Sequence, residues 1–237
     1  MGRAYEVRKA SIQKTGAAKA KLYSMYAREI YQAAKNGGVE LESNITLKRL
    51  VEKAKDEQVP SDIIKRAIDK VNSGVDESYE SVRYELFGPN GATLIVDCLT
   101  DNVNRSVSSI RAALNKTNSK MGVSGSVSYM YDNLCIVSFK GLTIEEAMDL
   151  MIENDIDIVD IFEDENIIIY GNPTSLYEIK EAIIKKVPNV TFDICDIVMI
   201  PKDKVKLTGE DLDNFNKLLT MLDDIEDVRQ VYHNVEL

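Results

Sequence analysis

The side chains best suited to chemistry in this sequence are lysines and arginines near its start. Residues 1–72 carry 15 Lys and Arg against 9 Asp and Glu, whereas the remainder carries 14 against 30. The formal charge of −10 therefore conceals a basic first segment of +6 and an acidic remainder of −16. Because charges act over about 8–10 Å at physiological salt, the basic segment can attract phosphates locally.

This charge distribution predicts a nucleic-acid backbone as the partner. Lys and Arg neutralise phosphates without reading bases. Residues 1–17 hold few large apolar groups, so we expect an arm that orders on contact, followed by a basic helix. The predicted nucleic-acid-binding residues are Arg3, Arg8, Lys9, Lys14, Lys19, Lys21, Arg28 and Lys35. The alternative is a solvated helical surface in a protein that binds no nucleic acid.

A polar loop between a predicted strand and a predicted helix is the secondary candidate site. It contains Asp101, Asn102, Asn104 and Arg105, and Asp101 or Asn102 can cap the helix. Residues 122–125 have the GxxG outline of a loop that clamps a nucleic-acid backbone. They include no basic residue, which favours an ordinary turn.

Catalytic and metal sites find little support in the sequence. His233 is the single histidine, and no Ser or Cys nucleophile lies near it in the sequence. The acidic runs at 155–160 and 223–227 lack the glycine and the ligand spacing of a calcium loop. No GxGxxG or GxxxxGK[ST] segment occurs. We therefore predict a non-enzyme with no catalytic residue, no metal ligands, no cofactor and no small-molecule substrate.

Three cysteines lie singly inside apolar stretches, without the paired spacing of a metal site or a disulfide framework. They are Cys98, Cys135 and Cys195. This predicts reduced core residues. No apolar run approaches the ~20 residues of a membrane span, and the start lacks the apolar core of a signal peptide. We expect a cytoplasmic protein that binds no membrane and is a monomer.

The first third of the chain predicts a bundle of three helices. A helix over 17–36 has an apolar stripe and ends at Gly37–Gly38. A second helix begins after the N-cap Asn44, and a third opens at Pro60. Short links between short helices are typical of a small bundle.

The rest of the chain alternates strands and helices. A hairpin of strands 84–86 and 93–99 turns at Gly88–Gly91, where Asn90 and Gly91 tolerate positive φ. The further predicted elements are helix 103–116, polar turn 117–125, strands 126–131, 135–139, 156–162, 167–170, 192–200 and 228–235, and helices 143–153, 173–186 and 209–222. Residues 135–200 thus read βαββαβ, the ferredoxin-like order.

The last helix and strand need a sheet, and the hairpin unit needs a covering helix. Pairing these two parts leaves the βαββαβ block as an insertion between them. The predicted class is α+β: an N-terminal three-helix bundle plus two α/β domains, one inserted in the other. The expected domains are 1–75, 76–131 together with 201–237, and the inserted 132–200.

Five segments of the sequence resemble a known family. They read RxIYxAAKxGG at 28–38, RYExFGPNG at 83–91, LTDNxNR at 99–105, GSVSYMY at 125–131 and DVxxVYHNV at 227–235. In this order they resemble the YebC family, most closely its YeeN-like branch, over essentially the whole chain. Two departures bear on partner contacts: Tyr5 stands where a tryptophan is usual, and Asn118–Ser119 where a glycine pair is expected.

The resemblance implies a fold and two kinds of function. The fold is a helical bundle followed by two α/β domains, the third inserted in the second. Family members are described as probable transcriptional regulators that bind DNA. Others, including the mitochondrial translational activator of cytochrome oxidase, act on translation at the ribosome. No enzymatic activity is implied.

The hypothesis that follows is a cytoplasmic, non-enzymatic regulator of gene expression that binds DNA through its basic segment. One alternative is a translation factor that acts at the ribosome through ribosomal RNA. Another is a protein–protein adaptor whose acidic body docks on a basic partner. In the adaptor hypothesis the contact residues include Asp223, Asp224, Glu226 and Asp227.

Overall fold

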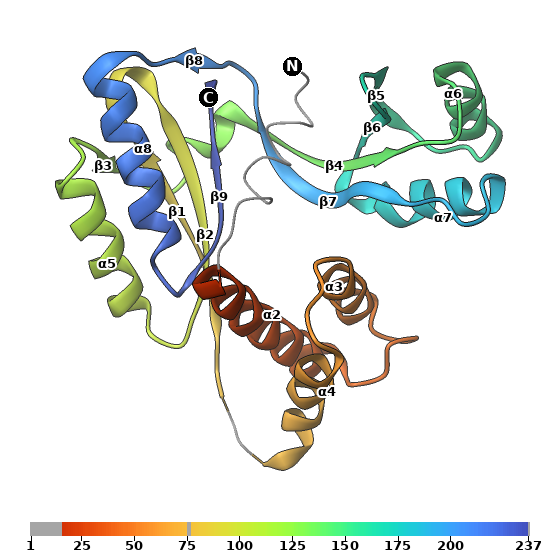
Figure 1. Ribbon diagram of the computed structural model, residues 1–237, viewed down its shortest axis with the longest axis horizontal. Coiled ribbons are helices and arrows are strands. Elements are labelled where there is room, and N and C mark those ends of the chain that lie inside the picture. Colours follow the sequence, from red (N-terminus) through yellow and green to blue (C-terminus); the bar gives the residue numbers. More distant parts are fainter. Residues whose placement is uncertain (1–15, 75–76, 237) are drawn as a thin grey trace. The chain divides into compact units, whose positions relative to one another are not determined.

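A computed structural model describes residues 16–74 and 77–236, with side chains from residue 19 onward (Figure 1). The chain forms two compact units. One contains residues 128–204. The other combines 16–74 and 77–127 with 205–236. The predicted site residues Arg3, Arg8, Lys9 and Lys14 lie outside the described residues.

Three α-helices and a short 3₁₀ segment make up the bundle (Figure 1). They are α2 (Gly16–Gly37), α3 (Ile45–Asp56), α4 (Ser61–Asp69) and η1 (Lys70–Ser73). Their apolar faces meet around Tyr26, Ile30 and Leu47, each at most 1% exposed. The bundle is therefore held together by amphipathic faces, as the sequence predicted.

Asn44 fixes the connection between α2 and α3. Its side-chain oxygen accepts the Leu47 N–H at 3.0 Å, and its amide donates to the carbonyls of Ala33 and Gly38 at 2.9 and 2.7 Å. The N-cap role predicted for Asn44 is confirmed. The same side chain also satisfies the end of the preceding helix.

A four-stranded antiparallel sheet forms the α/β part of this unit, in the order β3-β1-β2-β9. Its strands are β1 (Glu80–Phe87), β2 (Thr93–Thr100), β3 (Lys120–Met121) and β9 (Val228–His233). The helices α5 (Val103–Asn115) and α8 (Gly209–Asp223) pack on it through Ile110, Phe215 and Leu218. Two short parallel strands, β8 (Val205–Lys206) and β10 (Val235–Glu236), lie beside each other.

The hairpin between β1 and β2 turns through η2 (Pro89–Gly91), with Asn90 at φ 45° and Gly91 at φ 82°. Both positive angles match the residues predicted to tolerate them. Strand β9 pairs with β2, so the end of the chain joins the hairpin's sheet, as predicted.

Residues 128–204 form a second antiparallel sheet in the order β5-β6-β4-β7. The chain runs through η3 (Ser128–Met130), β4 (Tyr131–Phe139), α6 (Ile144–Glu153), β5 (Ile158–Glu163), β6 (Ile167–Gly171), η4 (Pro173–Ser175), α7 (Leu176–Lys186) and β7 (Phe192–Pro201). This is the βαββαβ order predicted. Helices α6 and α7 cover the face that carries Val137, Ile169 and Ile197. Thr143 and Glu146 form the predicted capping box.

The strand predicted at Ser126–Tyr131 is wrong. The backbone turns there and continues as η3, and β4 then begins at Tyr131. The cause is the buried carboxylate of Glu85, which accepts the N–H groups of Gly125, at 2.7 Å, and Val127. Because a side chain binds these N–H groups, they are not available for hydrogen bonds to a neighbouring strand.

Candidate nucleic-acid interface

The predicted basic residues of α2 differ in how far they are available to a partner. Lys19 is exposed. The Lys21 ammonium donates to the main-chain carbonyl of Asp223. Lys35 is exposed and donates to the Glu77 carbonyl at 2.8 Å. Lys19 and Lys35 are therefore the described members of the predicted set that face water.

Arg28 takes part in an internal ion-pair cluster centred on Asp227. Its guanidinium contacts the carboxylates of Glu226 and, at 3.4 Å, Asp227. Arg105 donates to both oxygens of Asp227, at 3.1 and 2.7 Å, and the Ser106 hydroxyl donates at 2.7 Å. The Asp227 side chain is only 2% exposed. The cluster joins α2, α5 and the turn before β9.

The electrostatics of this cluster favour a charged carboxylate. Burial alone raises the pKa of Asp227, but hydrogen bonds from Arg105, Ser106 and Thr100 together with the Arg105 charge outweigh it and lower that pKa. The pKa of Arg105 is raised by its hydrogen bonds to Asp227 and Asp101. Both groups are therefore ionised across the physiological range.

The secondary candidate loop belongs to the same cluster. The Asn102 side chain accepts the Arg105 N–H at 3.1 Å and caps α5, and Asp101 accepts from the Arg105 guanidinium at 2.7 Å. Asn104 is exposed. The loop thus acts as a structural joint, and two of its four residues are engaged in holding Arg105 toward Asp227.

A hollow of about 400 Å³ on the bundle was not identified from the sequence. It lies between α2, α4 and the segment that leads into β1, and its lining includes Arg28, Tyr31, Arg66, Lys70 and Tyr79. Aromatic and cationic side chains meet there. The signal in the sequence was the i, i+3, i+4, i+7 spacing of the lining residues on both helical segments, which our prediction of the bundle did not use.

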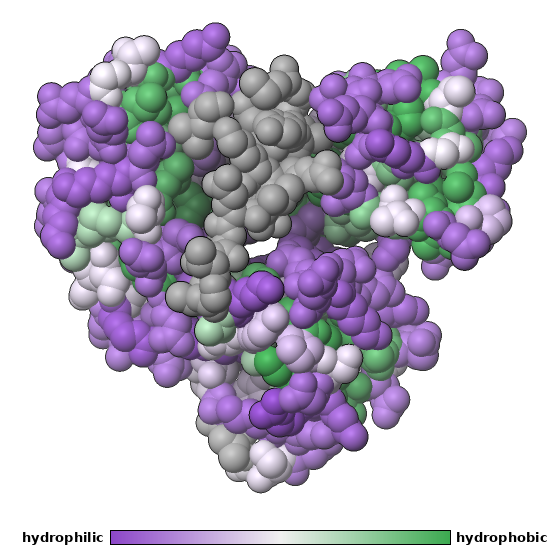
Figure 2. All heavy atoms as spheres, in the orientation of Figure 1, coloured by the Kyte–Doolittle hydropathy of each residue, from purple (hydrophilic) through white to green (hydrophobic). Residues whose placement is uncertain are grey.

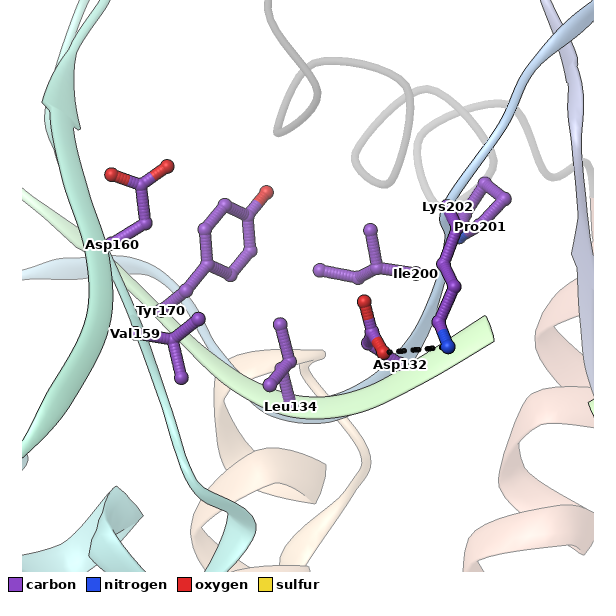
Figure 3. A pocket seen from close by; sticks show the side chains of 8 residues that line it. All are labelled: Asp132, Leu134, Val159, Asp160, Tyr170, Ile200, Pro201 and Lys202. Carbon is purple, nitrogen blue, oxygen red and sulfur yellow. Dashed lines mark ion pairs between the residues drawn. The ribbon is translucent and has the colours of Figure 1, made fainter. Parts of the chain in front are cut away.

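A smaller hollow, of about 240 Å³, lies in the unit of residues 128–204, called the second unit below, on the sheet face opposite to α6 and α7 (Figure 3). Leu134 and Ile200 point into it, and Asp132, Asp160 and Lys202 stand at its edge (Figure 3). Lys202 lies 3.5 Å from Asp132. Two carboxylates against one paired ammonium make this hollow unsuited to phosphate.

Other chemistry finds no support in the described residues. No group of three or more His, Cys, Asp or Glu side chains in 16–74 and 77–236 is placed to hold a metal ion. Within the same residues, no helix is both long enough and apolar enough to cross a membrane. His233 packs edge-on against Phe215, with ring centroids 5.2 Å apart. The visible surface of the bundle is mainly hydrophilic (Figure 2).

Two family models match successive parts of the chain. The first, described as the TACO1/YebC protein N-terminal domain, matches residues 3–74, and the second, described as the TACO1/YebC second and third domain, matches residues 79–235. The chain belongs to the TACO1/YebC family. This confirms the family resemblance found in the motifs, whereas the YeeN-like branch stays a prediction.

Relatives of this TACO1/YebC protein match it over its whole length. A probable transcriptional regulatory protein of Vibrio parahaemolyticus is 45% identical over all of both chains. One of Alteromonas mediterranea is 42% identical over 99% of this chain and 98% of its own. The crystal structure of a conserved hypothetical protein from Aquifex aeolicus has a TM-score of 0.78 and 34% identity, and covers 94% of this chain and 92% of that one. The α+β fold is shared.

The family motifs pair with one another in the TACO1/YebC fold. Arg28 and Arg105, from two motifs, meet on Asp227 of a third. Glu85 binds the amides of the 125–131 motif. Asn234 accepts the Thr93 N–H at 2.8 Å. The motif side chains therefore hold the fold together, and cations outside these pairs are the better candidates for phosphate contact.

Proposed function

We propose that this protein is a non-enzymatic regulator of gene expression that binds nucleic acid through its basic N-terminal segment and bundle. The observation that supports this proposal is the segregation of charge: residues 1–72 carry a formal charge of +6, and the remaining residues carry −16. Relatives of matching length are named probable transcriptional regulatory proteins, which supports DNA as the first target to test.

The ion pairs of the described residues reduce the set of residues that we propose contact phosphate. Lys21 and Arg28 contact acidic residues at 223–227, so we assign them to the joint between bundle and sheet. Lys19 is exposed on α2, and Lys55 is exposed on α3. We propose that these lysines act with the basic residues of the arm.

The same contacts weaken the adaptor alternative. Asp223, Glu226 and Asp227, three of the four acidic residues that it needs, already face cations of this chain. Reversing their charge would repel α2 from the turn before β9. A partner lost in that variant would therefore report damage to this joint as much as loss of a docking surface.

Salt dependence of binding tests the proposal. The triple change Lys9→Gln, Lys14→Gln and Lys19→Gln should flatten the slope of log K against log salt by about 2–3, since each phosphate contact contributes about 0.7–0.9. It should weaken binding at least tenfold at ~150 mM salt. The matched control changes three exposed lysines of the acidic remainder to Gln, at Lys185, Lys186 and Lys217.

The assay uses promoter DNA and ribosome co-sedimentation side by side. The proposal is upheld if the wild type binds DNA, the first triple variant binds it more weakly, and the control triple variant binds it as tightly as the wild type. Sedimentation with ribosomes and no DNA complex would replace DNA by ribosomal RNA as the target. Equal slopes for both triple variants would exclude the arm and α2 as the binding surface.

A further inference from the structure

The hollow on the bundle has a well-defined lining. It is lined along α2 by residues 24, 27, 28 and 31, and along α4 and the start of η1 by residues 63, 66, 67 and 70, so each helical segment presents one continuous face. Ser24, Ala27 and Ala67 are small, and their short side chains leave the space open. A volume of about 400 Å³ lies within the range of small-ligand sites.

Two tyrosines make the aromatic wall of this hollow. The rings of Tyr31 and Tyr79 meet edge to face, with centroids 6.2 Å apart at 81°. The Tyr31 hydroxyl accepts the Glu77 N–H at 3.1 Å, and the Tyr79 hydroxyl donates to the Glu77 carboxylate at 2.9 Å. Tyr31 is buried, whereas Tyr79 is partly exposed. Both rings are thus fixed before any ligand arrives.

Three cations stand around the aromatic wall. The Arg28 guanidinium lies 5.9 Å from the Tyr79 ring centroid, and the Lys70 ammonium lies 5.7 Å from that of Tyr31. Arg66 is 73% exposed and pairs with Asp62 within α4. Glu77 is the one carboxylate among the lining residues, and it binds Lys70 at 2.6 Å. The lining itself thus carries three cations and one carboxylate, while Asp62, Glu226 and Asp227 outside the lining pair with Arg66 and Arg28.

We propose that this hollow binds one nucleotide unit, with its base against Tyr79 and its phosphate at Arg66 and Lys70. Aromatic rings accept any base by stacking, and an adjacent cation holds the charge. A base stacked inside a duplex is not available to such a hollow. The site therefore favours a single strand over a duplex. This deepens the proposed function and rests on it.

Burial and the neighbouring Glu77 raise the pKa of Tyr79 to about 12, so the phenol stays neutral and does not repel a phosphate. The hollow on the second unit also contains a tyrosine, Tyr170, but its edge is acidic (Figure 3). The hollow on the bundle differs from it by a lining with three cations and one carboxylate.

Binding of the full chain to three probes tests this site. The probes are a uridylate hexamer, a blunt-ended RNA duplex, and uridine monophosphate. At ~150 mM salt the hexamer should bind at least tenfold more tightly than the duplex. Tyr79→Leu should weaken hexamer binding about tenfold or more, and Arg66→Gln about threefold. Tyr79→Phe, which keeps the ring, should stay within about threefold.

Lys65→Gln is the matched control, because Lys65 is an exposed cation next to Arg66 in sequence but does not line the hollow. It should change hexamer binding less than twofold. Uridine monophosphate should shift the amide resonances of Lys70 and Tyr79. Saturation by the monophosphate as tight as by the hexamer identifies a free nucleotide as the ligand. Hexamer binding at least tenfold tighter identifies a strand. Both outcomes uphold the nucleotide site.

Failure of the site and failure of the proposed function give different results. If Arg66→Gln and Tyr79→Leu bind the hexamer as the wild type does while the Lys9, Lys14 and Lys19 triple variant weakens, the nucleotide site is overturned and the proposed function stands. If no nucleic acid binds the wild type, the proposed function falls. The monophosphate titration then decides alone, and unshifted Lys70 and Tyr79 resonances at about 10 mM overturn the site.

Discussion

Replacing Asp227 with Asn should loosen the joint between α2, α5 and β9 while leaving the second unit unchanged. The carboxylate is 2% exposed and accepts from Arg28, Arg105 and Ser106. Asn keeps the shape but turns one acceptor into a donor that faces the Arg105 donors. Breaking a buried charge pair costs about 3–5 kcal/mol. Because the Arg105 side chain is 48% exposed and water can solvate it, we expect about 2–3 kcal/mol.

Native-state hydrogen exchange is the suitable assay, because a chain with two compact units need not unfold in one step. When stability falls by 2–3 kcal/mol, hydrogen exchange that requires opening of the structure becomes about 30- to 150-fold faster. We expect that acceleration for amides of α5 and for the Leu99 N–H, which bonds the Asp227 carbonyl at 2.9 Å. Amides of residues 128–204 serve as the internal reference. The matched control is Asp224→Asn, an exposed neighbour.

The pH dependence has a definite sign. The pKa of Asp227 is lowered in the folded protein, so its contribution is fully present above the ordinary Asp pKa of about 3.9 and is lost as the pH falls through the lowered value. The difference between wild type and Asp227→Asn should therefore be largest near neutral pH and shrink as the pH falls below the ordinary Asp pKa of about 3.9. A change in exchange of less than threefold at pH 7 would refute the reasoning. So would a coupling energy below about 0.5 kcal/mol in a double-mutant cycle with Arg105→Gln.

Two further predictions concern other buried groups. Glu85→Gln should cost about 1–3 kcal/mol and speed exchange of the Gly125 and Val127 amides, whereas the exposed Glu80→Gln should not; protected amides in Glu85→Gln would contradict the role given to this carboxylate. Burial raises the pKa of the Cys98 thiol to about 12, so iodoacetamide at pH 8 should modify the partly exposed Cys195 first and Cys98 only on unfolding, as peptide mass mapping will show.

The elements that could be predicted from the sequence are those fixed by nearby residues. The N-caps Asn44 and Thr143 act on amides three residues ahead, and the turn at Asn90–Gly91 depends on its own backbone angles. Apolar stripes placed the bundle helices because their period matches the helix. Each of these signals lies within one or two helical turns of the structure it determines.

The features that could not be predicted from the sequence depend on residues far away in the chain. Residues 126–131 were predicted as a strand, yet the carboxylate of Glu85, some 40 residues earlier, accepts the N–H groups of Gly125 and Val127. Arg28 was predicted to bind phosphate, and its contact with Asp227, 199 residues later, could not be read from the sequence. The small residues that open the hollow on the bundle also looked like ordinary helix packing. In each case the sequence showed the type of residue but not the residue with which it interacts.

The family motifs show why fold was easier to predict than site. Arg28, Arg105 and Asp227 need one another, because removing any of them leaves a buried or half-buried charge without its partner. Each of the three residues stands in a different motif, so the order of these motifs in the sequence reports the fold. The cations proposed to bind phosphate differ from these groups: within the described part of the chain, Lys19 is exposed and Arg66 pairs with Asp62 of its own helix. Their proposed role depends on a molecule outside the chain, and a binding measurement tests it.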